Sequence, residues 1–388
     1  MNLDIVLIAL GVVFLAGLAL DALGRRMHVP RVSLLILLGV VVGPPVLDLL
    51  PLDIASANDA YAPIALSMVA FLLGGTLNTA ALRERGRQIL TLSVTVVLAT
   101  AAFVGGGLLL AGAPLVVALA LAGIATATDP AATRDVVRES GATTPFSANI
   151  LGIVAIDDVW GVLAFSLILA ALDMMTGAGM GDSIAVGLRD VGGGVLLGVV
   201  LGVPAAALTG RLRPGEPTLI EAVGVVLLTV GLALWLEVSY LIAGMTCGAV
   251  VANLARHHEQ PFHEIQQIEW PFMLLFFVLA GGSLDMSYLP QAGWLVVLYI
   301  GLRIAGRLVG GWLGDLLTRQ PGHDGLWTGL GLLPQAGVAV GMALVAAERF
   351  PELGEPILAV TITATVAFEV VGPLLTGLAV RRAGDGRR

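Results

Sequence analysis

The chain has 388 residues, of which 57% are hydrophobic and only 12% are charged, and its mean hydropathy is +0.95. This composition excludes a water-soluble globular protein of such length and indicates an all-α polytopic membrane protein. The single cysteine, Cys247, excludes an intramolecular disulfide. The formal net charge of −8 says little about partners, because the charges fall in short connections, and we expect no nucleic acid among those partners.

Thirteen segments are apolar over about the 20 residues that a helix needs to cross a bilayer. The predicted spans are 3–23, 30–47, 60–80, 88–111, 114–136, 146–172, 184–209, 217–236, 239–255, 270–286, 291–317, 325–347 and 355–380. The connections between them are mostly too short to fold independently, and the chain ends at Arg388 shortly after its last span. We therefore expect no separate soluble domain.

The placement of arginine predicts the orientation of the spans. Cytoplasmic connections are enriched in basic residues, and all 20 basic residues of this chain are arginine. The connections after odd-numbered spans, and the C-terminus, carry Arg25, Arg26, Arg31, Arg83, Arg85, Arg87, Arg134, Arg138, Arg211, Arg213, Arg256, Arg319, Arg381, Arg382, Arg387 and Arg388. The opposite side carries only Arg189 and Arg349. We expect an integral plasma (inner) membrane protein with its N-terminus outside and its C-terminus cytoplasmic, which requires an odd number of spans.

Two predicted spans are interrupted near mid-membrane, the fifth and the twelfth. The residues at these interruptions are Thr126, Thr128, Asp129 and Pro130 in the first, and Gly331, Pro334, Gln335 and Gly337 in the second. Proline removes a backbone donor and clashes with the preceding turn, so each helix should unwind there. Unwound backbone at that depth is tolerated only where protein or a cavity surrounds it. A single proline would indicate an ordinary kink, but two at corresponding places favour a transporter's binding site.

The same correspondence divides the chain into two related halves. Spans 1–6 and 8–13 form two repeats, with span 7 as a linker. The odd number of spans makes the repeats inverted relative to each other. The sequence thus predicts about 13 transmembrane helices in two inverted repeats, with two broken helices that cross.

Two adjacent carboxylates, Asp157 and Asp158, lie in the middle of the sixth span, within an apolar run from Phe146 to about Met174. An acidic side chain near the midplane costs at least about 2.5 kcal/mol, so it must face protein, water or a cation. Neighbouring residues on a helix point about 100° apart, so the two acids can have different roles. We interpret them as an ion or proton site rather than as a structural pair neutralised by one base.

Three further charges lie deep in predicted spans. Arg303 and Arg307 are four residues apart and share one face of the eleventh span, while Glu369 lies in the thirteenth. Either arginine can form an ion pair with one of the two aspartates, and these charges form one cluster if their spans pack together.

A carboxylate that binds either a proton or a cation at one site is the minimal device for exchanging the two. Alkali cations prefer oxygen ligands, and the first interruption offers Thr126, Thr128, Asp129 and backbone carbonyls freed by unwinding. We expect transported Na⁺ to bind Asp158 and Asp157, with Asp129 and Thr128 beside them.

An intramembrane aspartyl protease also uses two buried aspartates, but these face each other from different helices and share a proton. Adjacent aspartates on one helix cannot do so. We therefore expect a secondary transporter rather than an enzyme, with monovalent cations, protons and the lipid bilayer as partners and no cofactor.

Four motifs resemble the monovalent cation:proton antiporters, which have the Na⁺/H⁺ exchanger fold. They are Thr128-Asp129-Pro130, Asp157-Asp158, the run Leu333-Pro334-Gln335-Ala336-Gly337-Val338-Ala339, and the run Phe368-Glu369-Val370-Val371-Gly372-Pro373. The aspartate pair is typical of a bacterial two-aspartate type, which implies exchange of Na⁺ or Li⁺ for H⁺.

The resemblance implies that Asp158 is the main carrier of the ion and the proton. It also implies that Asp157 forms an ion pair with a base that is usually lysine, and here Arg307 takes that place, with Arg303 as the alternative. Arginine does not release its proton in proteins. The aspartate pair resembles electrogenic members and the arginine resembles electroneutral ones, so both stoichiometries stay open.

The resemblance further implies a homodimer built from two domains. A dimerisation domain would comprise residues 1–81 and 213–290, and a core ion-transport domain residues 82–175 and 291–388, with residues 176–212 as the linker helix. K⁺ exchange of the potassium-efflux type is the alternative function. Those members typically carry a soluble nucleotide-binding domain, which we do not expect here.

Overall fold

The computed structural model describes residues 3–27, 31–44, 46–49, 54–75, 86–140, 144–176, 180–209, 218–255, 259–282, 289–318, 325–335 and 337–385. Within these ranges the chain forms fifteen α-helices, one short 3₁₀-helix and no β-strand. The helices are α1 (Leu3–Met27), α2 (Arg31–Val42), α3 (Ile54–Gly75), α4 (Gly86–Leu110), α5 (Leu115–Ile124), α6 (Pro130–Glu139), α7 (Pro145–Thr176), α8 (Met180–Thr209), α9 (Thr218–Trp235), α10 (Tyr240–Leu254), α11 (Glu259–Gly282), α12 (Leu289–Thr318), α13 (Gly325–Gly331), α14 (Gly337–Arg349), η1 (Pro351–Leu353) and α15 (Gly354–Asp385).

The all-helical, polytopic architecture predicted from the sequence is confirmed. Each of the thirteen predicted spans has its helix, and the fifth and twelfth are each split into two half-helices, α5 with α6 and α13 with α14. Seven helices of the described residues are long and apolar enough to cross a membrane, and five shorter apolar helices accompany them. The prediction of two interrupted spans is therefore correct.

The predicted boundaries differ most at α11, which begins at Glu259 rather than at residue 270. Its first turns contain several polar residues, so hydropathy alone does not include them. They still form a helix, because Pro261 lies in its first turn, where proline is tolerated, and α11 accommodates Pro271 in its interior. A hydropathy window finds the apolar part of a helix rather than its ends.

Helix packing repeats itself between the two halves of the chain. α3 packs against α10, and α2 packs against α11. In the two repeats α2 corresponds to α10, and α3 corresponds to α11. The contact between α3 and α10 therefore has its counterpart in the contact between α11 and α2. In both pairs, a Cβ added to a glycine would lie 2.0 to 2.1 Å from a carbonyl oxygen of the partner helix, at Gly39, Gly74, Gly248 and Gly281. Such backbone contact through small residues is typical of membrane helices, and both inverted repeats use it.

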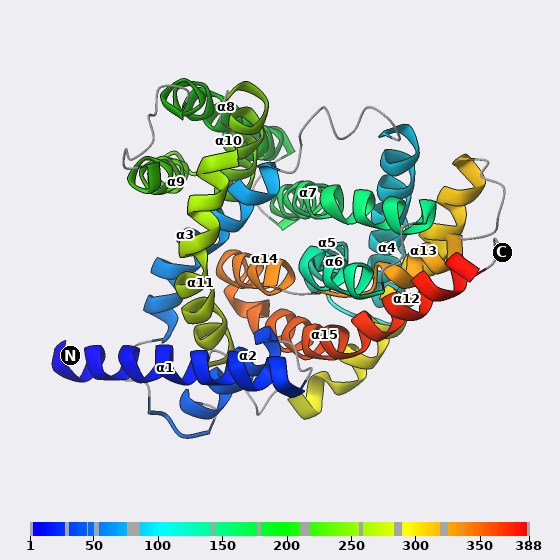
Figure 1. Ribbon diagram of the computed structural model, residues 1–388, viewed down its shortest axis with the longest axis horizontal. Coiled ribbons are helices and arrows are strands. Elements are labelled where there is room, and N and C mark those ends of the chain that lie inside the picture. Colours follow the sequence, from blue (N-terminus) through cyan, green and yellow to red (C-terminus); the bar gives the residue numbers. More distant parts are fainter. Residues whose placement is uncertain are drawn as a thin grey trace.

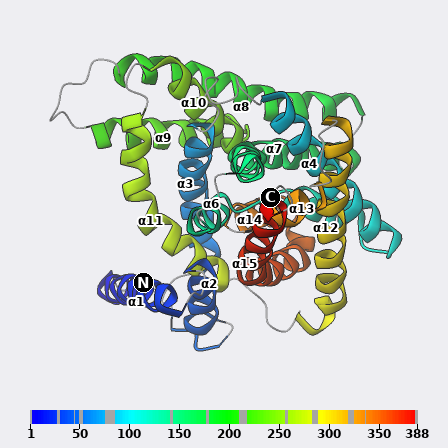
Figure 2. The ribbon, with the colours of Figure 1, turned by 45° about the vertical axis from the view of Figure 1, so that its right-hand side comes forward.

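The interrupted helices lie within one group of helices. Figure 1 shows α4–α7 and α12–α15 gathered on one side of the molecule, with α8–α10 and α3 on the other. Within the first group α4 packs along α12, and α12 runs along one edge of the molecule in Figure 2. The division into a core and a dimerisation domain stays a prediction.

Candidate functional site: buried charges at two interrupted helices

The first interruption follows α5, which ends at Ile124. The backbone continues in a tight turn, with the amide of Ala127 donating to the Ile124 carbonyl oxygen over 3.2 Å. α6 then begins at Pro130, whose missing amide hydrogen is tolerated in a first helical turn. Asp129 caps α6, because its Oδ1 accepts a hydrogen bond from the amide of Ala132 over 3.0 Å. This contact gives Asp129 a structural role whatever else it binds.

The second interruption follows α13, which ends at Gly331, and precedes α14, which begins at Gly337. The amides of Leu332 and Leu333 each donate a hydrogen bond to the carbonyl oxygen three residues earlier, which closes the end of α13. Pro334 lies in the unwound segment, so the predicted breaking position is correct. Ala336 lies outside the described residues.

Arg307 of α12 forms a buried ion pair with Asp157 of α7. Its Nη1 lies 2.8 Å from Asp157 Oδ2, and both side chains are 0% exposed. The hydroxyl of Ser93 in α4 donates to the other oxygen, Oδ1, over 3.2 Å. Both oxygens of Asp157 therefore accept hydrogen bonds, which offsets the cost of burying the charge.

Arg307 also caps the end of α5. Its Nη2 donates to the carbonyl oxygens of the three residues that follow the helix, Ala125, Thr126 and Ala127. These carbonyls have lost their intrahelical partners and carry the negative end of the α5 dipole. A guanidinium presents several donors in a fixed fork, so it can bind them and Asp157 together.

Arg303, one turn before Arg307, joins the two interruptions. It donates to the Ala125 and Ala127 carbonyl oxygens over 3.1 and 2.8 Å, and to the Leu333 carbonyl oxygen over 2.7 Å. Its guanidinium carbon lies 4.2 Å from the centre of the Phe368 ring in α15, a cation–π contact. Arg303 was the alternative partner of Asp157; its hydrogen bonds instead hold the C-terminal ends of two half-helices together.

Gln335 makes a second link between the interruptions. It is completely buried, and its Nε2 donates to the Ile124 carbonyl oxygen and to the Tyr299 hydroxyl, each over 3.3 Å. Tyr299 precedes Arg303 by one turn of α12, so both links run along the same face of that helix. Arg303 and Gln335 together fix the two unwound segments against each other.

These contacts correct one expectation about cation ligands. The freed carbonyls of Ala125, Thr126 and Ala127 accept hydrogen bonds from permanently charged arginines. A cation would meet those positive charges at close range, so these carbonyls are poor ligands for it.

The remaining predicted site residues lie as follows. Thr128 is buried in the first interruption, and Asp129 is half-buried beside it. Asp158 follows Asp157 in α7, and its side chain lies outside the described ones. Glu369 of α15 is buried and accepts a hydrogen bond from Ser33 of α2, at a different helix contact from the arginines.

The sequence reasoning missed Ser93 and Tyr299, which contact this cluster directly. Tyr299 lies four residues before Arg303 and eight before Arg307, so helical spacing alone could have assigned it to the basic face. Ser93 is one of several hydroxyl residues in α4, and no pattern in the sequence distinguishes it from its neighbours.

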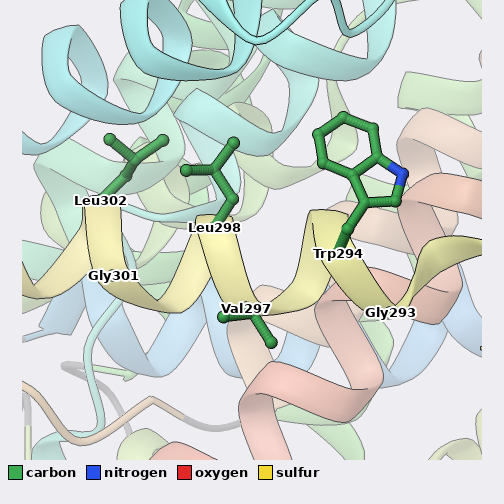
Figure 3. Close-up of a pocket in the computed structure, with 6 residues that line it drawn as sticks. All are labelled: Gly293, Trp294, Val297, Leu298, Gly301 and Leu302. Atoms are coloured by element: carbon green, nitrogen blue, oxygen red, sulfur yellow. The ribbon is translucent and has the colours of Figure 1, made fainter.

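A groove on α12 lies away from this chemistry. Its volume is about 580 Å³, and it is lined by Gly293, Trp294, Val297, Leu298, Gly301 and Leu302. Figure 3 shows Trp294, Leu298 and Leu302 projecting from one side of α12. No charged side chain lines the groove, so it does not suit an ion.

We expect Gly372→Ala to lower the free energy of unfolding by about 1–3 kcal/mol, the usual cost of overpacking a tight contact. A Cβ at Gly372 of α15 would lie 2.7 Å from the Cα of Pro334 and 2.8 Å from its nitrogen, and backbone atoms cannot move aside easily. Denaturation of the purified protein in detergent measures the change. Gly224→Ala in α9 is the control, because a Cβ there meets nothing within 4 Å. Equal effects of the two changes would contradict the tight contact at Pro334.

An all-helical membrane protein with two interrupted helices held together by buried charges has the architecture of a secondary ion transporter. A family model described as "Sodium/hydrogen exchanger, transmembrane" matches residues 10–381, and the chain belongs to that family.

Known relatives agree with this assignment. The chain is 24% identical over 351 residues to the ammonium/H⁺ antiporter subunit AmhT of Alkalihalophilus pseudofirmus, covering 88% of this chain and 86% of the relative. It is 26% identical over 211 residues to the Na⁺/H⁺ antiporter NhaP of Pseudomonas aeruginosa, covering 51% of this chain and 49% of the relative. The structure of the sodium proton antiporter MjNhaP1 from Methanocaldococcus jannaschii at pH 8 has the same fold, with a TM-score of 0.79 over 99% of both chains at 17% identity.

Proposed function

We propose that the protein exchanges Na⁺ or Li⁺ for protons across the plasma (inner) membrane by alternating access of a carboxylate site. The observation that carries the proposal is the buried pair of Asp157 and Arg307 at the first interrupted helix, with a second aspartate, Asp158, next to Asp157 in α7. Membership of a sodium/hydrogen exchanger family supports the same reaction class.

In this proposal Asp158 is the group that binds the cation and the proton in turn. Asp157, the other predicted ligand, already accepts hydrogen bonds from Ser93 and Arg307 at its two oxygens, so in this proposal it contributes less to cation binding than Asp158. Thr128 and Asp129, on the α6 side of the first interruption, supply further oxygen ligands. This assignment leaves the arginine-capped carbonyls outside the cation site.

The pair also bears on stoichiometry. Arg307 keeps its charge throughout the cycle because arginine does not deprotonate in proteins. Asp157 then stays ionised beside it, and Asp158 exchanges a single proton for a single cation without net charge movement. Solid-supported-membrane electrophysiology checks this version: we expect no transport-dependent transient current on a Na⁺ jump, and a Na⁺-evoked transient current that scales with transport would contradict it.

Two other cations are candidates. The relative AmhT, which aligns with most of this chain, is named as an ammonium/H⁺ antiporter subunit, so NH₄⁺ is the second candidate. K⁺, similar in size to NH₄⁺, is the third. We favour Na⁺ and Li⁺ because neighbouring carboxylates create a strong field, and a strong field favours a small ion.

Architecture and topology enter the proposal as well. α4–α7 and α12–α15 would form a core that moves against a dimerisation domain of α1–α3 and α9–α11, with α8 as the linker. The functional unit would be a homodimer whose N-terminus lies outside and whose C-terminus is cytoplasmic. Chemical crosslinking in membranes tests the dimer, and sided labelling of an introduced terminal cysteine tests the orientation.

The purified protein in proteoliposomes with an imposed pH gradient tests the proposed exchange. Additions of Na⁺, Li⁺, K⁺ and NH₄⁺ are compared by the cation-driven collapse of the gradient, read with an entrapped pH dye. We expect Na⁺ and Li⁺ to collapse it at lower concentrations than K⁺ or NH₄⁺. A response to NH₄⁺ or K⁺ alone would contradict the sodium assignment, and no response to any of the four would contradict antiport.

A further inference from the structure

Three of the buried oxygen atoms that have no hydrogen-bond partner among the described residues lie at the second interruption and on α15. They are Oε1 of Gln335 and the hydroxyl oxygens of Thr361 and Thr365, and all three side chains are 0% exposed. A buried polar group without a partner is costly, and natural proteins usually satisfy it with protein or water. Three such groups in one part of the molecule therefore need an explanation.

The orientation of Gln335 follows from its partner. Nε2 must face the Ile124 carbonyl oxygen, because a carbonyl accepts hydrogen bonds and cannot donate one. Oε1 is therefore the atom that points away from α5 and remains unpaired. This amide is fixed at one end and offers a free acceptor at the other.

The two threonines differ from other helical threonines of this chain. A threonine inside a helix can donate to the carbonyl oxygen four residues earlier. Thr91, Thr100, Thr229 and Thr376 do so, over 2.7 to 3.1 Å. Thr361 and Thr365 make no such bond in the described structure, although both lie well inside α15. Their hydroxyls therefore remain available to a partner outside their own helix.

The face of α15 that carries these threonines also contacts the charged cluster. At about 100° per residue, Thr361, Thr365, Phe368 and Gly372 fall within about 60° of one another around the helix. Phe368 lies under Arg303, and Gly372 packs on Pro334. Thr365 and Thr361 therefore continue the same face by one and two turns beyond Arg303.

Gln335 lies on that same side of Arg303. On α12, Tyr299 precedes Arg303 by one turn and accepts the hydrogen bond from Gln335. Figures 1 and 2 show α12 and α15 running in the same general direction, so the residues that precede Arg303 on α12 and those that precede Phe368 on α15 lie on the same side of the contact between these two side chains. Gln335 and both threonines therefore lie on the side of Arg303 where α12 and α15 begin.

We infer that Gln335, Thr365 and Thr361 line a narrow route for water and protons that reaches the interrupted helices from the side where α12 and α15 begin. Water suits the route because it both donates to Gln335 Oε1 and bonds the threonine hydroxyls. A metal cation suits it less, because the permanent charge of Arg303 faces it. That the route serves exchange rests on the proposed function; that it holds water does not.

Valine substitutions at the two threonines test whether the hydroxyls contact water or remain without any partner. Thr365→Val and Thr361→Val keep the shape of the side chain and remove the hydroxyl. On a water route we expect each to slow cation-driven proton movement in proteoliposomes about five- to tenfold, the effect of one lost hydrogen bond on a rate. The melting temperature should not fall. Unchanged exchange together with a raised melting temperature would overturn the inference, since removing a dry unpaired group stabilises a fold.

Thr376→Val is the matched control on the same helix. Its hydroxyl is paired with the carbonyl oxygens of Gly331 and Gly372. We expect it to lower the melting temperature and to leave the exchange rate per folded molecule unchanged. An equal loss of exchange in Thr376→Val would mean that α15 packing, rather than the route, accounts for the effect.

A second readout does not depend on transport. Brief X-ray radiolysis creates hydroxyl radicals where water is bound, and mass spectrometry then locates oxidised side chains. We expect Thr365→Cys to be oxidised much faster than Thr376→Cys, with buried Cys247 as an internal reference in both proteins. Equal, slow oxidation of both introduced cysteines would overturn the route. Rapid oxidation of Thr365→Cys in a protein that exchanges no cation would uphold the water route and contradict the antiport.

Discussion

Arg307→Ala is expected to lower the free energy of unfolding by about 3–5 kcal/mol, because it leaves Asp157 charged and unpaired in a completely buried site. The same change removes the donors from the carbonyls that follow α5, which adds to the loss. Chemical or thermal unfolding of the purified protein in detergent measures the effect. We expect Asp157→Asn in the Arg307→Ala background to restore part of the stability, since it removes the stranded charge.

An exposed ion pair of this chain is the control for that experiment. Arg189 and Glu237 lie 3.3 Å apart, and their side chains are 56% and 77% exposed. Arg189→Ala should cost less than about 1 kcal/mol, as exposed pairs usually do. Strictly additive losses in the double variant at 157 and 307 would contradict a coupled buried pair, as would losses no larger than that of Arg189→Ala.

Asp158→Asn is expected to abolish cation-driven proton movement while the protein stays folded. Asparagine has nearly the size of aspartate but carries no charge and binds no exchangeable proton, so neither half of the exchange can occur. Proteoliposomes with an imposed pH gradient measure the loss, and a melting curve confirms the fold.

Asp158→Glu is the matched control, because it keeps the carboxylate and alters only its reach. We expect it to retain measurable exchange, with a weaker apparent affinity for the cation. Near-normal exchange by a well-folded Asp158→Asn protein would remove Asp158 from the mechanism.

Hydropathy and proline placement predicted most of the architecture. Apolar length along the chain reports directly on membrane spans, and Pro130 and Pro334 mark the interruptions for a local reason, because proline cannot continue a helix that precedes it. The deep charges were equally visible, because an acid or base in an apolar run stands out against its neighbours. These features are local in sequence, and the structure has them where they were expected.

The partners of those charges were less predictable. The bonds of Arg303 to the carbonyl oxygens of Ala125, Ala127 and Leu333 join residues at least 30 positions apart in the chain. Every residue has a backbone carbonyl, so no sequence motif identifies the particular carbonyl oxygens that accept these hydrogen bonds. From the sequence, the carbonyls of the unwound segment were therefore interpreted as cation ligands, whereas in the structure they accept hydrogen bonds from arginine side chains.

The most direct test of the mechanism is the number of protons released when the cation binds. Isothermal titration of the purified protein with Na⁺, in two buffers of different ionisation enthalpy, gives that number for each bound cation. If Asp158 alone exchanges while Asp157 stays paired with Arg307, release should approach one proton per Na⁺ at a pH where Asp158 is protonated, and should vanish in Asp158→Asn. Release approaching two protons per Na⁺, or release that persists in Asp158→Asn, would contradict a single exchanging carboxylate.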